Sequence, residues 1–178
     1  CLSRGEQGMK RVMKKKASEG RITHLRCRRI QAPIVSSLIQ GFAEEIGFDK
    51  TIEVAKKVIN KDAIESGEKL AQEYSGNTMS ELTKIVKEVW AQDDAMKIQI
   101  IRENDNELFF DVTYCGYAQM YEKMGIKELG FIFSCSRDFP FMGGFNSEIE
   151  LTRTKTIIYI FSFMLSPAYI STLQQCDR

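Results

Sequence analysis

The stretch that decides the fold is MKIQIIRENDNELFFDVTY, at residues 96–114. Apolar and polar side chains alternate there in steps of two on both sides of Asn104-Asp105-Asn106, a tripeptide suited to a turn. Such alternation is typical of strands with one buried face, so the stretch predicts a β-hairpin. Alternation resumes at 149–156, which predicts a further strand. The apolar segment 157–165 predicts a buried strand, with an exposed, aggregation-prone edge as the alternative.

Upstream of the hairpin, apolar residues recur every three or four positions, which predicts four helices. The first ends at Gly47, and its expected inward face consists of Ile30, Ile34, Leu38, Phe42 and Ile46, with Val35, Ile39 and Ala43 beside them. The second is expected from 49 to 59 and the third over 63–74. Residues 78–81, Thr-Met-Ser-Glu, have the spacing of a capping box and open the fourth.

Two segments downstream of the hairpin complete the expected fold. Residues 117–124 predict a short helix that stops at Gly125. Residues 139–145 predict a loop, because Pro140 and the pair Gly143-Gly144 interrupt regular structure. Helices followed by strands predict the α+β class, with N-terminal helices packed on a mostly antiparallel sheet.

The charge of the chain is concentrated at one end. Residues 1–29 hold ten Lys or Arg and two Glu, so this end carries +8 although the whole chain carries +1. Such an arm can bind nucleic acid or an anionic membrane, but no aromatic residue that could stack on a base lies among the charges. We therefore prefer a basic, disordered leader at 1–25, followed by a single α+β domain at 26–178.

Five cysteines occur in the chain: Cys1, Cys27, Cys115, Cys135 and Cys176. Their odd number and the lack of a secretory signal predict a reduced, cytoplasmic setting. No apolar run reaches the roughly 20 residues of a transmembrane helix, so no membrane span is expected. Because neither CxxC nor HExxH spacing occurs, neither a metal nor another cofactor is expected.

Three blocks in the second half of the chain carry a family pattern. They are Tyr114-Cys115-Gly-Tyr117-Ala118-Gln-Met-Tyr121 with Met124-Gly125 and Glu128-Leu129-Gly130, then Ser134-Cys135-Ser-Arg137-Asp138-Phe139 with Gly144-Phe145-Asn146, then Leu151-Thr152-Arg153-Thr154-Lys-Thr156-Ile157. In this order and spacing they resemble the L-2-amino-thiazoline-4-carboxylic acid hydrolase family over roughly residues 26–157. The C-terminus departs from the pattern, since 158–175 separate the third block from Cys176-Asp177-Arg178.

The resemblance implies a hydrolase that opens the ring of L-2-amino-thiazoline-4-carboxylate and yields N-carbamoyl-L-cysteine, in cysteine metabolism. The expected partner is thus a small carboxylated heterocycle and not a nucleic acid, and a homo-oligomer stays open. The family layout is also similar to small-ligand-binding domains of the vinyl-reductase type. A non-catalytic ligand-binding or sensing domain is therefore the alternative.

Ring opening requires a nucleophile or activated water, a proton donor and a cation for the carboxylate. Arg137 and Arg153 are the candidate carboxylate ligands, because a guanidinium forms two parallel hydrogen bonds with a carboxylate. Their alternative is ion pairing, for example between Arg137 and its neighbour Asp138. Tyr117, Tyr121 and Asn146 are candidates for orienting the substrate, although a Tyr is commonly a core residue.

The candidate catalytic residues are Cys135, Asp138 and Cys115. A thiolate could attack the ring carbon and form a covalent intermediate, and Cys135 is favoured because Arg137 could lower its pKa. The alternative for both cysteines is simple burial as small apolar side chains. Asp138 could instead activate water directly, or merely cap a turn. His24 lies in the basic leader and is interpreted as exposed and incidental.

Overall fold

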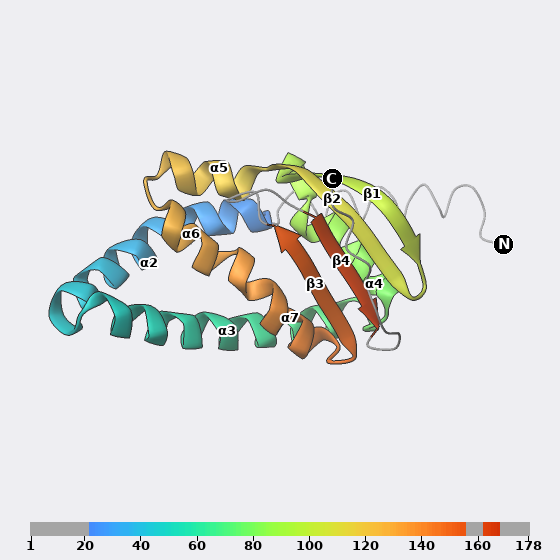
Figure 1. Ribbon diagram of the computed structural model, residues 1–178, viewed down its shortest axis with the longest axis horizontal. Coiled ribbons are helices and arrows are strands. Elements are labelled where there is room, and N and C mark those ends of the chain that lie inside the picture. Colours follow the sequence, from blue (N-terminus) through green and yellow to red (C-terminus); the bar gives the residue numbers. More distant parts are fainter. Residues whose placement is uncertain (1–21, 156–161, 168–178) are drawn as a thin grey trace.

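The computed structural model describes residues 22–155 and 162–167, which form helices and one four-stranded sheet (Figure 1). In chain order the elements are α2 (His24–Ile46), α3 (Phe48–Glu73), α4 (Met79–Ile85), β1 (Met96–Asn104), β2 (Glu107–Cys115), α5 (Gly116–Lys123), α6 (Lys127–Phe133), α7 (Asp138–Phe145), β3 (Ile149–Lys155) and β4 (Ser162–Pro167). Short helical turns η1 (Val86–Trp90), η2 (Gln92–Asp94) and η3 (Cys135–Arg137) connect them. The predicted α+β class is confirmed.

The N-terminal helices form an antiparallel hairpin that extends away from the sheet (Figure 1). Most of the predicted leader, residues 1–21, lies outside the described residues, but Thr23 caps α2 and His24 begins it. Gly47 separates α2 from α3 with φ of 87°, a conformation that favours glycine. The predicted second and third helices are one continuous helix, α3, because no helix-breaking residue lies between them.

The capping box at the start of α4 is confirmed. The Thr78 hydroxyl accepts a hydrogen bond from the Ser80 amide at 3.3 Å, and the Glu81 carboxylate accepts one from the Thr78 amide at 3.2 Å. Two backbone donors that the first helical turn leaves free are thereby satisfied. Leu82 and Ile85 of this short helix are completely buried against the sheet.

The sheet has the strand order β1-β2-β4-β3, and all neighbouring strands are antiparallel. The predicted hairpin is confirmed as β1 and β2, which pair from Asn104 with Glu107 back to Met96 with Cys115. The strand predicted at 149–156 is observed as β3, with its last residue outside the described range. Of the apolar segment 157–165, residues 162–165 belong to β4 and 157–161 lie outside the described residues.

The loop predicted at 139–145 is wrong, because this segment forms α7. Pro140 is the third residue of the helix, where its missing N–H would have no partner inside the helix. The glycine at 144 has a packing reason: a Cβ there would lie 2.7 Å from the carbonyl carbon of Ile64 in α3. A Cβ on Gly67 would likewise lie 2.6 Å from the Phe145 nitrogen, so the two helices cross in near-backbone contact.

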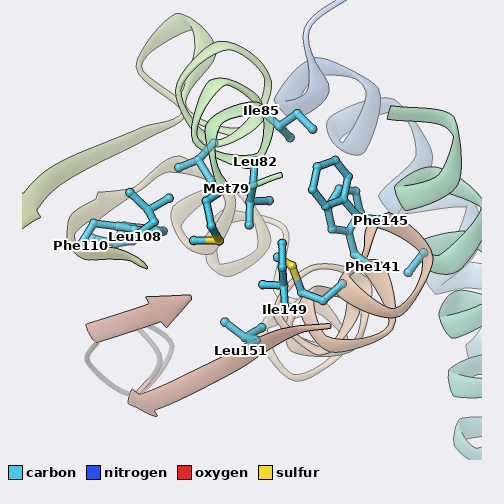
Figure 2. Packing of buried hydrophobic residues seen from close by; sticks show 13 residues of the cluster. Met79, Leu82, Ile85, Leu108, Phe110, Phe141, Phe145, Ile149 and Leu151 are labelled. Carbon is cyan, nitrogen blue, oxygen red and sulfur yellow. The ribbon is translucent and has the colours of Figure 1, made fainter. Parts of the chain in front are cut away.

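Two apolar cores hold the domain together. The first lies between the sheet, α4 and α7, and Figure 2 shows its members converging from these elements: Met79, Leu82, Ile85, Leu108, Phe110, Phe141, Phe145, Ile149 and Leu151. The second joins α2 to α5 and α6 through Ala32, Ile39, Tyr117, Met120, Tyr121, Ile126, Leu129, Ile132 and Phe133. Among the described residues, no helix is long and apolar enough to cross a membrane.

The predicted inward face of α2 is wrong in part. Val35 and Ile39 pack against the second core, but the four-step series Ile30, Ile34, Leu38, Phe42 and Ile46 is exposed. The side that α2 turns to the protein instead carries the small residues Ala32 and Ser36, which let the helix lie close to its neighbours. Apolar periodicity identified the helix correctly but assigned the wrong side of it to the core.

Candidate functional site

A cavity of about 300 Å³ lies where α2, α3 and α5 meet the sheet and the start of α7. This volume suits a small heterocycle, since ligand pockets begin at roughly this size. Six of the eight predicted site residues contribute to its wall: Cys115, Tyr117, Tyr121, Cys135, Arg137 and Asp138. The first and second sequence blocks therefore converge on one cavity.

Asp138 and Arg153 form a buried ion pair at the cavity wall. Arg153 Nη1 donates to Asp138 Oδ2 at 2.9 Å and to the backbone oxygen of Cys135 at 2.9 Å. The Arg153 side chain is 6% exposed and also lies over the ring of Phe139, while the Asp138 side chain is 22% exposed. Because Asp138 is a cavity residue and Arg153 is not, the guanidinium supports the carboxylate from behind.

Burial raises the pKa of the Asp138 carboxyl to about 7, despite the opposing influence of the Arg153 and Arg137 charges. A carboxyl with this pKa is present in both protonation states near neutral pH. It can therefore accept a proton and return one in the same reaction cycle, as general acid–base catalysis requires.

The two cavity cysteines are free thiols with raised pKa values. Burial, and then the negative charge of Asp138, raise the pKa of Cys135 to about 12, and burial also raises that of Cys115. The predicted lowering of the Cys135 pKa by Arg137 is wrong, because Arg137 is engaged elsewhere. Both thiols are protonated at neutral pH, which makes them poor nucleophiles unless a base removes the proton.

Arg137 links the site to α3. It forms an ion pair with Asp62 and donates to the backbone oxygen of Ile59 at 3.3 Å. Its side chain is only 10% exposed, so the short turn η3 is fastened to the long helix through this residue. The alternative of ion pairing is thus realised, although with Asp62 and not with the adjacent Asp138.

Two cavity residues on α2 were missed. Arg28 Nε is buried and has no hydrogen-bond partner among the described residues, and Arg28 Nη1 makes only a long contact of 3.4 Å with Gln31. His24 lies one helical turn earlier and contributes to the wall of the same cavity, so its interpretation as an exposed residue of the leader is wrong. The four-residue spacing of the two, together with Thr23 as an N-cap, is the signal that could have placed them on one helix face.

The remaining polar groups form short chains of hydrogen bonds. His24 Nδ1 lies 3.0 Å from the Tyr117 hydroxyl, which donates to the Trp90 backbone oxygen at 3.2 Å. Burial and the charges of Arg28 and Arg137 lower the pKa of His24 to about 4, so its ring is neutral at pH 7. The Tyr121 hydroxyl pairs with that of Ser134 at 3.0 Å. Both tyrosines are thus core residues whose hydroxyls are satisfied at the cavity edge.

Asn146 does not belong to the cavity, which corrects its assignment as a substrate-orienting residue. It follows α7 as the C-cap, its amide donates to the Asn77 backbone oxygen at 3.0 Å, and its Oδ1 accepts from the Glu148 amide at 2.9 Å. The residue therefore shapes the turn into β3. Within the part of the chain that the structure describes, no cluster of three metal-ligating side chains occurs.

The fold and the site define an α+β protein with a cavity of small-ligand size, whose wall includes the Asp138 carboxylate with Arg153 paired behind it. The chain belongs to the L-2-amino-thiazoline-4-carboxylic acid hydrolase family, whose model matches residues 27–159. The resemblance inferred from the three blocks is thereby confirmed over nearly the same range. A comparison with curated proteins finds no match.

Proposed function

We propose that this chain hydrolyses L-2-amino-thiazoline-4-carboxylate to N-carbamoyl-L-cysteine in the cavity beside Asp138. The observation that carries the proposal is the pairing of Asp138 with Arg153, because it presents one carboxylate, held from behind, to a cavity of about 300 Å³. The family match supports the same class of reaction. Positioned acid–base groups of this kind typically contribute about 10²- to 10⁴-fold to a rate.

The proposed reaction begins with water held by the Asp138 carboxylate. Water attacks the ring carbon that lies between nitrogen and sulfur, and Asp138 takes one of its protons. The bond from that carbon to sulfur then breaks, and the protonated Asp138 gives the proton to the departing sulfur. The second proton of the water moves to the ring nitrogen, so one water is consumed and a carbamoyl group and a thiol are formed.

Arg28 is the best ligand for the substrate carboxylate, since the two arginines favoured from sequence are already committed to Asp62 and Asp138. A buried guanidinium donor without a partner is costly, and an incoming carboxylate would satisfy it. Arg28 also lies near Arg137, since the charge of Arg137 helps to lower the pKa of Arg28. Because Asp62 neutralises Arg137, Arg28 supplies the positive charge that favours an anion on this side of the cavity.

Water, and not a cysteine thiolate, is the proposed nucleophile. Cys135 and Cys115 are protonated at neutral pH, whereas Asp138 can hold and activate water without a covalent step. In this scheme the two thiols are small apolar parts of the wall. Arg153 is a positioning residue, because it acts on the reaction through Asp138.

The test is thiol release from L-2-amino-thiazoline-4-carboxylate by the purified chain, with the carbamoyl product identified by mass spectrometry. We expect turnover by the wild type and a loss of about 10²-fold or more in Asp138→Asn. Asp105→Asn is the matched control, because Asp105 lies in the exposed turn of the hairpin. Absence of thiol release from a folded sample would overturn the proposal.

A non-catalytic binding role is the second candidate, and the unpartnered Arg28 donor favours it independently of any reacting group. It predicts that carboxylated thiazolines raise the melting temperature of the chain, more so the tighter they bind, but are recovered unchanged. Product formation at a rate that depends on Asp138 would exclude this candidate.

A further inference from the structure

The outer side of α2 carries an apolar ridge. Its side chains follow one another at four-residue steps over four helical turns, and each is about half exposed or more: Ile30 (56%), Ile34 (63%), Leu38 (54%), Phe42 (56%) and Ile46 (49%). A surface helix ordinarily turns such a row to the core, but the cavity and the second core occupy the opposite side of α2. Contiguous exposed apolar surface of this kind marks an interaction site.

A groove of small residues runs beside the ridge. Pro33, Ser37 and Gly41 also lie at four-residue steps, and all three are exposed. A Cβ built on Gly41 would meet no atom within 4 Å, so the space above the groove is open. Two helices pack when the ridge of side chains on one fits the groove on the other, and rows at four-residue spacing give the commonest class of such packing.

The charges at the two ends of α2 specify the direction of a partner helix. Arg26 and Arg29 lie at its start, Glu44 and Glu45 at its end, and all four are exposed. Residues 30–43 between them carry no charge. An antiparallel copy of the same helix would bring the cations of each end opposite the anions of the other, whereas a parallel copy would bring like charges together.

We propose that a second copy of this chain covers the ridge, through antiparallel pairing of the two α2 helices about a two-fold axis. Arg29 and Glu45 are equally far from Ser37, so an axis at the level of Ser37 places Arg29 level with Glu45 of the partner subunit. The axis then passes through the middle of the apolar ridge. The pairing is isologous, because the same patch of each subunit forms the interface. The assembly therefore closes at the dimer.

This interface would brace the wall of the cavity. α2 contributes His24 and Arg28 from its inner side and the ridge from its outer side, so the same rigid helix belongs to both. The proposal does not depend on the reaction assigned to the cavity, because the ridge, the groove and the end charges are independent of it. Its test accordingly measures association and not turnover.

Sedimentation of the full chain across a wide range of concentration is the first test. We expect a reversible dimer, and we expect Leu38→Glu to weaken it by at least about thirtyfold, as for a residue at the centre of an interface. Ile101→Glu is the matched control, because Ile101 is similarly exposed on β1, away from α2. A wild type that stays monomeric at all concentrations would overturn the proposal. This holds also if another segment of the same chain covers the ridge.

Charge reversal tests the antiparallel direction. Arg29→Glu and Glu45→Arg should each weaken the homodimer by roughly tenfold, because every such dimer then holds two repulsive pairs. When the two variants are mixed, both pairs in the mixed dimer become attractive, so association should return to the wild-type level. Mixing without recovery would show that α2 does not pair in this way, even if a dimer exists.

Discussion

Arg153 Nη1 lies 2.9 Å from Asp138 Oδ2 and 2.9 Å from the backbone oxygen of Cys135, so one guanidinium nitrogen fastens β3 to both the carboxylate and the turn before it. The pair is almost fully enclosed on the Arg153 side. Because the carboxylate is the member that reaches the cavity, the geometry divides the roles: Asp138 meets the ligand and Arg153 fixes Asp138.

Replacement of Arg153 by Lys should shift the pH profile of the reaction to higher pH. A lysine keeps the charge but loses the planar fork, and its ammonium cannot hold both acceptors in the same geometry. Since the Arg153 charge and hydrogen bond lower the pKa of Asp138, their weakening should raise that pKa further. We expect kcat/KM at pH 7 to fall by roughly tenfold, with partial recovery at higher pH.

The control for this change is Arg102→Lys, because Arg102 pairs with Glu107 on the exposed hairpin and its side chain is 61% exposed. An unchanged pH profile in Arg153→Lys would contradict the positioning role, whatever its effect on stability.

Replacement of Arg28 by Gln should raise KM far more than it lowers kcat. The variant removes the charge proposed to bind the substrate carboxylate but leaves Asp138 and Arg153 in place. We expect roughly a tenfold to hundredfold loss of kcat/KM for the carboxylated substrate, in line with a charge-assisted hydrogen bond. The thiazoline without its carboxylate should be turned over equally by wild type and variant. An equal loss of kcat/KM with that analogue would show that Arg28 does not act by binding the carboxylate.

Replacement of Cys135 by Ser should leave activity within a few-fold of the wild type. Because burial and Asp138 raise the pKa of this thiol to about 12, it should also react with iodoacetamide at pH 7 far more slowly than free cysteine. Quenched reaction mixtures analysed by mass spectrometry should contain no substrate adduct on the chain. An adduct at Cys135, together with loss of turnover in the Ser variant, would establish covalent catalysis instead.

The crossing of α3 and α7 should tolerate alanine at only one of three glycines. Gly67→Ala and Gly144→Ala each place a Cβ under 3.0 Å from backbone atoms of the other helix, so a loss of about 2 kcal/mol or more in the free energy of unfolding is expected. Gly143→Ala meets no atom within 4 Å and should stabilise α7 by up to about 1 kcal/mol. Urea unfolding of the three variants would decide; equal stabilities would contradict the close crossing.

Asp138→Asn should be more stable than the wild type at pH 8, with the difference shrinking as the pH falls to 4. The carboxyl ionises near 3.8 in the unfolded chain and near 7 in the folded one, so the folded state binds more protons between these values. Wild-type stability therefore decreases as the pH rises through this window, by up to about 4 kcal/mol from this group. Urea unfolding at several pH values measures the difference, and a gap that does not vary with pH would refute the raised pKa.

Local signals in the sequence predicted most elements of the fold. The capping box from Thr78 to Glu81 and the alternation on either side of residues 104–106 are short-range patterns, and both elements form as they indicate. The prediction of a loop at 139–145 was wrong because the effect of Pro140 and Gly144 depends on their position. Pro140 lies in the first turn of a helix, where proline is tolerated, and Gly144 lies where two helices cross closely. Such roles are set by the tertiary structure.

The site was predictable only in so far as the family blocks identified it. Cys115, Cys135 and Asp138 reach one cavity, but nothing local separates Asn146, which shapes a turn, from these neighbours. Arg28 was missed because it lies far upstream, in a basic segment interpreted by its charge alone. The ridge on α2 was assigned to the core for a related reason: periodicity identifies an apolar side of a helix but not what covers it.

The most direct test of the proposed chemistry is the pH dependence of kcat/KM for thiol release from L-2-amino-thiazoline-4-carboxylate, measured for the wild type and for Asp138→Asn. We predict that the wild-type value rises with an apparent pKa near 7, as the Asp138 carboxyl loses its proton, and that the variant retains about one hundredth of the activity or less, without this rise. A wild-type profile that is flat from pH 5 to 9, or a variant as active as the wild type, would contradict the assignment of Asp138 as the group that activates water.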